Sequence, residues 1–280
     1  MKVYAVSDIH TDFPTNYEYM STLPKQEEGS VLIISGDISD QLSIIEKTLK
    51  MLKEKYTHIF YTFGNHELWI GRDDNKKYND SIEKWNALEQ LCKQLGVYTT
   101  PTRLNNKLAI VPLVGWYHPS FDEQFELMSV SEKEETYAGL AKVWGDFKYC
   151  KWNFQSIDAA QFFLNINDQR IKEFKETHKS NYPENVITFS HFVPRRELLP
   201  PREKLIRKHL PLVVGCLQLD DQLRSINSNT HIFGHTHIDY DVKIDGVRYV
   251  QNAFSAPQER VGWKKPYITE PYRPVLVYSD

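Results

Sequence analysis

The sequence predicts an α/β fold, and two observations support that prediction. Short apolar segments rich in β-branched and aromatic residues recur along the chain, and segments with helical periodicity lie between several of them. Alternation of strands with amphipathic helices is typical of α/β proteins. A length of 280 residues is compatible with one such domain and with a sizeable buried core. We therefore expect residues 1–280 to form a single domain.

Six apolar segments have the length and composition of buried strands. They are residues 3–7, 31–35, 59–63, 108–114, 186–190 and 231–234. Residues 240–254 alternate apolar and polar side chains around Asp245-Gly246, which predicts a hairpin. Residues 274–278 are expected to form one more strand.

Two segments show the periodicity of amphipathic helices, residues 43–55 and residues 81–96, the second ending at Gly96. Residues from about 117 to 185 differ, because they are rich in aromatic and charged side chains and have little strand character. We interpret this region as an insertion, or cap, on the single domain.

Composition argues against several classes of protein. No apolar run is long enough to span a membrane, and Asp8 interrupts the apolar N-terminus too early for a signal peptide. A net charge of -3 argues against a general nucleic-acid binder, so no stable nucleic-acid partner is expected. The three cysteines, Cys92, Cys150 and Cys216, are far apart and are interpreted as reduced thiols of a cytoplasmic protein.

Residues that can bind metal ions follow five of the expected strands. The motifs are DIH at 8–10, GD at 36–37, GNHE at 64–67, His191, and GHTH at 234–237. Ligands bind beyond the carboxyl ends of the strands in open α/β sheets, so we expect these residues to gather at one edge. Packing of the core does not explain why Asp, Asn or His follows each of these five strands, whereas a shared metal centre explains it.

The types of donor indicate which metals could bind. Carboxylate, amide and imidazole groups together suit Mn²⁺, Fe or Zn²⁺ and differ from a thiolate site. The donors are too numerous for one tetrahedral ion, and fit two ions roughly 3.5–4 Å apart that share a bridging carboxylate. Such a pair lowers the pKa of bound water and neutralises the oxygens of a phosphoryl group.

The ordered series DxH, GDxxD, GNHE, H and GHxH resembles the calcineurin-like metallophosphoesterase superfamily, and it spans residues 8–237. The resemblance implies two mixed β-sheets packed as a sandwich with helices outside. It also implies hydrolysis of a phosphate ester by in-line attack of a metal-bridging hydroxide. The cofactors would be two divalent or trivalent ions, Mn²⁺ and/or Fe, with Zn²⁺ as an alternative.

The resemblance also implies a role for each motif residue. One metal would be held by Asp8, His10 and His237, the other by Asn65, His191 and His235, and Asp37 would bridge them. His66 would not be a ligand. It would face the substrate and protonate the leaving oxygen or stabilise the transition state, and Asp40 would orient it.

One position departs from the Ser/Thr protein phosphatases of this superfamily, because Gln41 stands where they have a phosphate-binding arginine. This departure weakens the protein-phosphatase interpretation. Arg195 and Arg196, shortly after His191, are candidates to supply the missing positive charge, and Arg72 is another.

Aromatic residues predict a pocket that could stack on a base or ring. We expect Trp116, Tyr117 and His118 to line it, with Trp152 and Trp69 as further candidates. Such a pocket favours a phosphodiesterase or phosphatase that acts on a nucleotide or another small organic phosphate.

Four alternatives remain at this stage. Two lie within the superfamily, a protein phosphatase and a dinucleoside-polyphosphate or pyrophosphate hydrolase, and a third is a non-catalytic scaffold. The fourth is a metallo-β-lactamase-type hydrolase, because HTHID resembles HxHxDH, but Tyr240 replaces the last histidine. A zincin is excluded at HELWI, since Ile70 stands where the second histidine must be.

Overall fold

Ten strands lie within the residues that the computed structural model describes, which are 1–71, 74–205, 207–262 and 273–280. The strands are β1 (Lys2–Val6), β2 (Val31–Ser35), β3 (His58–Thr62), β4 (Thr102–Arg103), β5 (Leu108–Pro112), β6 (Asn185–Phe189), β7 (Thr230–Phe233), β8 (Tyr240–Ile244), β9 (Val247–Gln251) and β10 (Val275–Ser279). Nine coincide with the segments expected from the sequence, and only the two-residue β4 lies outside them.

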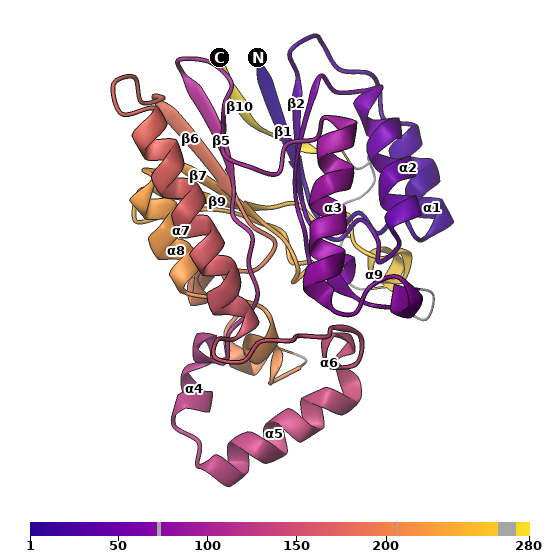
Figure 1. The fold of residues 1–280 in the computed structure, drawn as a ribbon, viewed down its shortest axis with the longest axis vertical. Helices are drawn as coiled ribbons and strands as arrows, with labels where there is room; N and C mark the ends of the chain where they lie inside the picture. The colour runs from indigo at the N-terminus through magenta and orange to yellow at the C-terminus, as the bar shows by residue number, and fades with distance from the viewer. Residues whose placement is uncertain (72–73, 206, 263–272) are drawn as a thin grey trace.

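The described strands form two mixed sheets, as the sequence predicts (Figure 1). The four-stranded sheet has the order β10-β1-β2-β3, and the six-stranded sheet has the order β4-β5-β6-β7-β9-β8. Strands β10, β4 and β8 are antiparallel to their neighbours, and all other pairs are parallel. The parallel strands of both sheets point toward the end of the molecule that lies opposite the two termini (Figure 1).

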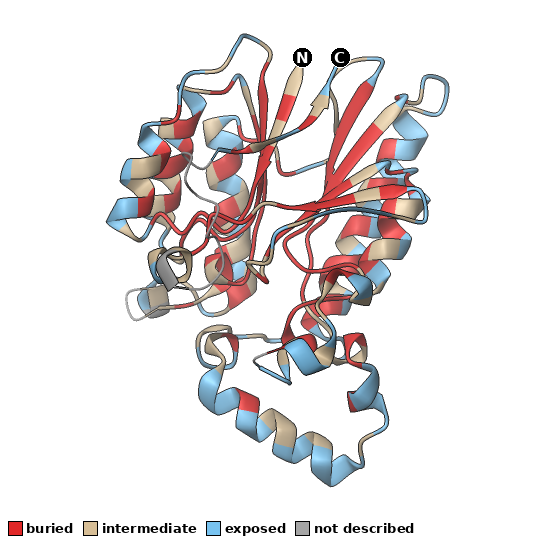
Figure 2. Ribbon diagram, turned by 180° about the vertical axis from the view of Figure 1, so that it is seen from behind, coloured by how far each residue is buried: buried red, intermediate tan, exposed pale blue. Residues whose placement is uncertain are grey.

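The space between the sheets is filled by alternate residues of their strands. These residues are Val3, Ala5, Val31, Ile33, Phe60, Leu108, Ile110, Ile187, Phe189, Ile232, Val250 and Val277. Many of the residues between them, such as Leu32 and Val111, pack against helices on the outside. Both faces of the central strands are therefore buried, which explains their continuous apolar sequences (Figure 2).

Helices cover the outer faces of both sheets (Figure 1). On the four-stranded sheet they are α1 (Pro14–Ser21), α2 (Leu42–Lys53) and α3 (Ser81–Leu95); on the six-stranded sheet they are α7 (Ala159–Thr177) and α8 (Gln218–Ser225). Asp80 is the N-cap of helix α3, and its carboxylate accepts hydrogen bonds from two backbone N–H groups. It ends at Gly96, which adopts a left-handed conformation with φ 63°, as its sequence predicts.

Three helices, α4 (Glu123–Glu126), α5 (Val130–Val143) and α6 (Gly145–Tyr149), project from the end of the sandwich where the parallel strands end (Figure 1). Helix α5 is largely exposed, and Leu140 is its buried residue (Figure 2). We call residues 119–157 the projecting segment. The broader region predicted as a cap, about 117–185, also contains α7, which buries Phe163 and Leu164. The division into one domain and a cap stays a prediction.

The remaining helical elements are short. They are α9 (Pro257–Gly262) and 3-10 turns at His66–Leu68, Asp74–Lys76, Pro119–Phe121, Arg196–Leu198, Arg202–Lys204 and Leu210–Val213. No helix in the described part of the chain is both long and apolar enough to cross a membrane.

Candidate metal centre

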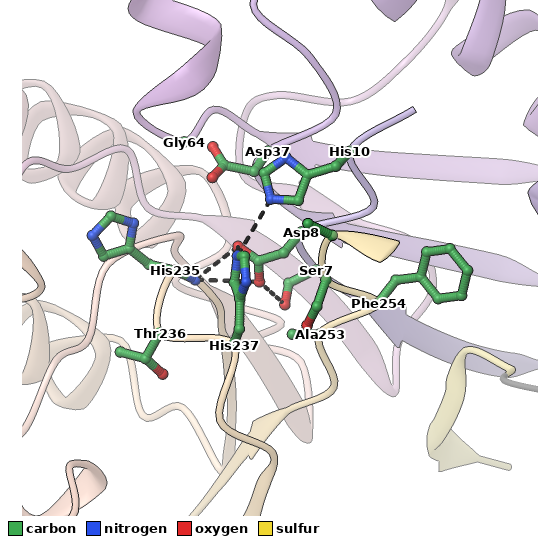
Figure 3. Close-up of polar contacts among 12 residues, drawn as sticks. Ser7, Asp8, His10, Asp37, Gly64, His235, Thr236, His237, Ala253 and Phe254 are labelled. Atoms are coloured by element: carbon green, nitrogen blue, oxygen red, sulfur yellow. Dashed lines mark hydrogen bonds and ion pairs between the residues drawn. The ribbon is translucent and has the colours of Figure 1, made fainter. Parts of the chain in front are cut away.

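The predicted ligand residues lie in the loops that follow β1, β2, β3, β6 and β7, and the structure brings them together. Figure 3 shows five of them, Asp8, His10, Asp37, His235 and His237. Two groups of side chains have ligand atoms within 4.8 Å of one another. We call Asp8, His10, Asp37 and His237 the first group, and Asp37, His191 and His235 the second group. Asp37 belongs to both groups, which is the position that a bridging carboxylate requires.

Asn65 joins the second group through its side-chain carbonyl. Its Oδ1 atom lies 3.1 Å from Nε2 of His191. Its Nδ2 atom donates in the opposite direction, to the carboxylate of Asp146 at 2.8 Å. All seven predicted ligands therefore lie in this cluster, and their assignment as ligands stays a prediction.

The backbone of this cluster is strained. Five predicted ligands have positive φ angles, namely Asp8 (52°), His10 (41°), Asp37 (58°), His235 (74°) and His237 (56°). Left-handed backbone is unfavourable for residues with a Cβ atom, and such strain is concentrated at functional sites. Three glycines directly precede predicted ligands, and at two of them, Gly36 and Gly64, a side chain would collide with the cluster. A Cβ atom on Gly64 would lie 2.1 Å from Oδ1 of Asp37, and one on Gly36 would lie 2.4 Å from Nδ1 of His191.

The histidines of the second group present lone pairs to each other. His191 donates from Nδ1 to the carbonyl of Ser35 at 2.8 Å, and His235 donates from Nε2 to the carbonyl of Val213 at 2.8 Å. Burial lowers the pKa of His191, and burial together with His191 lowers the pKa of His235 to about 4, so both rings are neutral. Their other nitrogens are 3.0 Å apart and both unprotonated. Two lone pairs at this distance repel, so the arrangement suits a metal ion.

The histidines of the first group differ in protonation, because His237 carries an extra proton at neutral pH. His237 Nδ1 contacts the carboxylate of Glu259, and its Nε2 lies 3.3 Å from Oδ1 of Asp8. Burial lowers the pKa of His237, but the carboxylates of Asp8 and Glu259 outweigh burial and raise it to about 9. His10, whose Nε2 lies 3.3 Å from Nε2 of His237, has a pKa lowered to about 3 by burial and by His237. A metal ion that bound here would displace the proton of His237.

Asp37 is electrostatically suited to cations on either side. Burial, followed by the nearby carboxylates of Glu67 and Asp8, raises the pKa of Asp37 well above its usual value. A bound cation reverses this balance, because it favours the ionised carboxylate. The donor set of both groups consists of oxygen and nitrogen atoms, which fits the metals expected from the sequence.

His66 lies next to both groups. Its Nε2 atom is 3.9 Å from Oδ2 of Asp37, and 29% of its side chain is exposed. Burial and then the neighbouring His10 lower the pKa of His66 well below its usual value. The ring stacks on Trp69, with centroids 3.8 Å apart, and this aromatic contact restricts its rotation.

Asp40 lies in the same loop as Asp37, but the described residues include no hydrogen bond between its carboxylate and His66. Its backbone carbonyl accepts a hydrogen bond from the buried Lys84, at 2.5 Å. The proposed orienting role of Asp40 stays a prediction. Trp69 stacks on the ring of His66, and His10 packs edge-to-face against it.

The two arginines predicted to bind substrate form ion pairs with acidic residues, and their contact with substrate stays a prediction. Arg195 forms ion pairs with Glu197, Asp220 and Asp245. Arg196 forms an ion pair with Glu123 and donates to two backbone carbonyls of the 3-10 turn at Pro119–Phe121. Both guanidinium groups therefore fasten loops, and Arg72 lies outside the described residues.

The aromatic residues predicted to line a substrate pocket differ in their burial and contacts. Trp116 is only 5% exposed and packs against Phe192 and Trp152 in the core, and its contact with substrate stays a prediction. His118 caps a 3-10 turn through Ser120, and its Nε2 lies 3.4 Å from Asp158. Tyr117 packs against Phe192, and burial, followed by the nearby carboxylate of Asp146, raises its pKa. A substrate contact of Tyr117 or His118 stays a prediction.

Three carboxylates that support the cluster were not assigned a role from the sequence. Glu67 accepts N–H groups of Asp37 and Gly64 at 3.0 and 2.7 Å, and the hydroxyl of Tyr61 at 2.7 Å. It therefore fixes the loops after β2 and β3 to each other. Asp146 and Glu259 are the other two, and no local motif marks them. Glu67 could have been found, because it completes the GNHE motif.

A family model for calcineurin-like phosphoesterases matches residues 1–239. The chain belongs to the calcineurin-like phosphoesterase family. As a member of this family it is a hydrolase that acts on phosphoester bonds, and the family depends on a dinuclear metal centre. The resemblance seen in the sequence is confirmed.

Within the family, the chain is similar to the acyl-carrier-protein phosphodiesterase PptH of Mycobacterium tuberculosis. The two are 23% identical over 282 residues, which cover 95% of this chain and 81% of PptH. The crystal structure of phosphopantetheinyl hydrolase (PptH) from Mycobacterium tuberculosis matches with a TM-score of 0.78 at 22% identity. The match covers 100% of this chain and 98% of that one, so the two share their fold.

Proposed function

We propose that this phosphoesterase is a phosphodiesterase whose substrate is a phosphopantetheinyl group joined to a carrier protein. One observation carries the reaction class, namely the two ligand groups that share Asp37 beside a stacked, non-ligating His66. The substrate is proposed by analogy with PptH, which is similar over 95% of this chain. The sequence favours a small organic phosphate, and the experiment below includes small diesters for that reason.

In this proposal Asp8, His10 and His237 hold one metal ion, and Asn65, His191 and His235 hold the other. Asp37 ligates both. The bound ions would supply positive charge to the phosphoryl oxygens and lower the pKa of a water nucleophile. Nitrogen and oxygen donors favour Mn²⁺ and/or Fe, with Zn²⁺ as the alternative.

His66 has the role of a proton donor or hydrogen-bond donor to the leaving oxygen. Its imidazole is neutral because its pKa is lowered, so the ring can donate a hydrogen bond from its one N–H. Transfer of a proton to the leaving oxygen would require the ring to be protonated first. Stacking on Trp69 holds the ring beside Asp37. Since 29% of the side chain is exposed, a leaving group can approach it. The backbone N–H of His66 donates to Oδ1 of Asp37 at 3.2 Å, which fixes the distance between the two residues.

The test compares three substrates at equal concentration with Mn²⁺-loaded protein. They are a phosphopantetheinylated carrier protein, bis-p-nitrophenyl phosphate as a small diester, and p-nitrophenyl phosphate as a monoester. We expect release of phosphopantetheine from the carrier with the highest kcat/KM, slower turnover of the small diester, and the slowest turnover of the monoester. A higher kcat/KM for the monoester would contradict the phosphodiesterase proposal. Turnover of small diesters without turnover of the carrier would contradict the proposed substrate.

A further inference from the structure

Asp146 lies in helix α6 of the projecting segment, and its carboxylate contacts the metal centre from outside. The residue is only 2% exposed. Its Oδ1 atom accepts hydrogen bonds from Nδ2 of Asn65 at 2.8 Å and from Nε1 of Trp69 at 2.6 Å. Its Oδ2 atom accepts one from Nε1 of Trp144 at 2.8 Å. Three N–H donors thus converge on one buried carboxylate.

The bond to Asn65 decides which end of the amide faces the ligands. A carboxylate can only accept, so the NH₂ end of Asn65 must point to Asp146. The carbonyl end then points to His191, where Oδ1 is 3.1 Å from Nε2. Only the carbonyl oxygen of an amide is a suitable metal ligand. Asp146 therefore selects the orientation in which Asn65 can serve the second group.

The hydrogen bond between Asp146 and Trp69 connects Asp146 to His66, the proposed hydrogen-bond or proton donor. The indole that donates to Asp146 stacks on His66 with an angle of 27° between the rings. Gly145, directly before Asp146, lies close against the same indole, since a Cβ atom there would be 2.8 Å from Cζ2 of Trp69. The backbone N–H of Ile70 also donates to the carbonyl of Tyr149 at 2.8 Å. Helix α6 and the loop after β3 thus form one packed unit.

The third donor, Trp144, connects Asp146 to His235 of the second group. Trp144 packs edge-to-face on His235, with ring centroids 6.1 Å apart. Burying a carboxylate is unfavourable unless hydrogen bonds compensate it, and here three donors do so. An amide side chain at this position would turn its own NH₂ group toward at least one of these donors. The cluster therefore requires an acceptor-only group.

We propose that Asp146 is a positioning residue, through which the projecting segment orients the amide of Asn65 and supports the ring of His66. This inference rests on the proposed function for the roles of Asn65 and His66. It assigns to the projecting segment a part in assembling the centre, in addition to any contact with substrate.

The test uses Asp146→Asn in the full chain, with Glu132→Gln as the matched control. Glu132 lies in the same segment, in the capping box of α5, and is exposed. Metal-free protein is titrated with Mn²⁺, and bound metal is measured directly. We expect the wild type and Glu132→Gln to bind two ions tightly. We expect Asp146→Asn to bind one ion as the wild type does and the other about 10- to 100-fold more weakly, the usual effect of losing such an outer hydrogen bond.

A second variant separates the two contacts. Trp69→Phe removes the donor to Asp146 and leaves the bond between Asp146 and Asn65. It should retain two ions and lower kcat with little change in KM, because only the support of His66 is weakened. It also keeps the inference testable if Asp146→Asn does not fold.

The outcomes distinguish the inference from the proposed function. Unchanged affinity for both ions in Asp146→Asn would overturn the inference. So would an equal loss of both ions together with a lower Tm of the metal-free protein, because that result indicates a merely structural role. Loss of one ion from Asp146→Asn in a protein that hydrolyses no phosphodiester would support the inference and contradict the proposed function.

Discussion

The first and second ligand groups around Asp37 differ in the partners that orient their histidines. In the second group, His191 and His235 donate to the backbone carbonyls of Ser35 and Val213. In the first group, His237 contacts a carboxylate, Glu259 of α9. Metal-binding histidines commonly have a partner of one of these two kinds, and this centre uses both.

The difference determines the charge of each group before a metal binds. Neutral carbonyls leave the second group with unprotonated nitrogens, and burial lowers the pKa of both rings. The carboxylates of Asp8 and Glu259 raise the pKa of His237 to about 9, so the first group retains a proton at neutral pH. We infer that the histidines of the second group can bind a cation without releasing a proton, whereas His237 of the first group must release one.

The largest effect is expected at the residue that both groups share. Asp37→Asn removes the common carboxylate, so at least one ion should be lost and kcat should fall by about 10³-fold or more, since a bound ion supplies several kcal/mol of charge stabilisation. Bound metal and turnover of bis-p-nitrophenyl phosphate are measured together. Retention of two ions at wild-type affinity would contradict the shared position of Asp37.

His66 should behave as a member of neither group. His66→Ala is expected to retain both ions and to lower kcat by about 10²–10⁴-fold, the usual contribution of a general acid. Metal content and steady-state kinetics are measured on the same preparation. If the variant lost an ion, His66 would be a ligand and the division into two groups would have to be redrawn.

Glu259→Gln tests the first group alone. The substitution removes the negative charge next to His237, so the affinity of one ion should fall by about 10- to 100-fold while the other is unchanged. In the metal-free protein the pKa of His237 should move down from about 9, as followed by NMR titration of the ring. A pKa that did not move would show that Asp8 alone holds the proton.

The smallest effect is a difference in pH dependence. Because the pKa of His237 is about 9, binding to the first group releases a proton at pH 7. Its affinity should therefore rise by about tenfold per pH unit between pH 7 and 9 and become constant above that range. The histidines of the second group should add no such dependence, because they are already neutral, and ionisation of the shared Asp37 accompanies the first ion that binds. Calorimetric titration in buffers of different ionisation enthalpy counts the protons, NMR of the rings assigns them, and proton release from His191 or His235 would contradict the comparison.

The sequence by itself determined the strands and the ligand motifs at their ends. Both are local signals: buried strands such as β2 need consecutive apolar residues, and tight loops need glycine beside a ligand, as at Gly36 and Gly64. The order of the motifs then identified the family, which the comparison over residues 1–239 confirmed.

Only the tertiary structure decided which residues surround the ligands. Asp146 meets Asn65 across 81 positions in the chain, and Glu259 meets His237 across 22, with no periodicity or motif to mark either pair. The same cause packs Trp116 in the core and pairs Arg195 with acids, and the sequence indicated neither contact. Hydrophobic pattern depends on neighbours along the chain. The partner of a ring nitrogen or a buried carboxylate depends instead on which loops meet at the end of the two sheets.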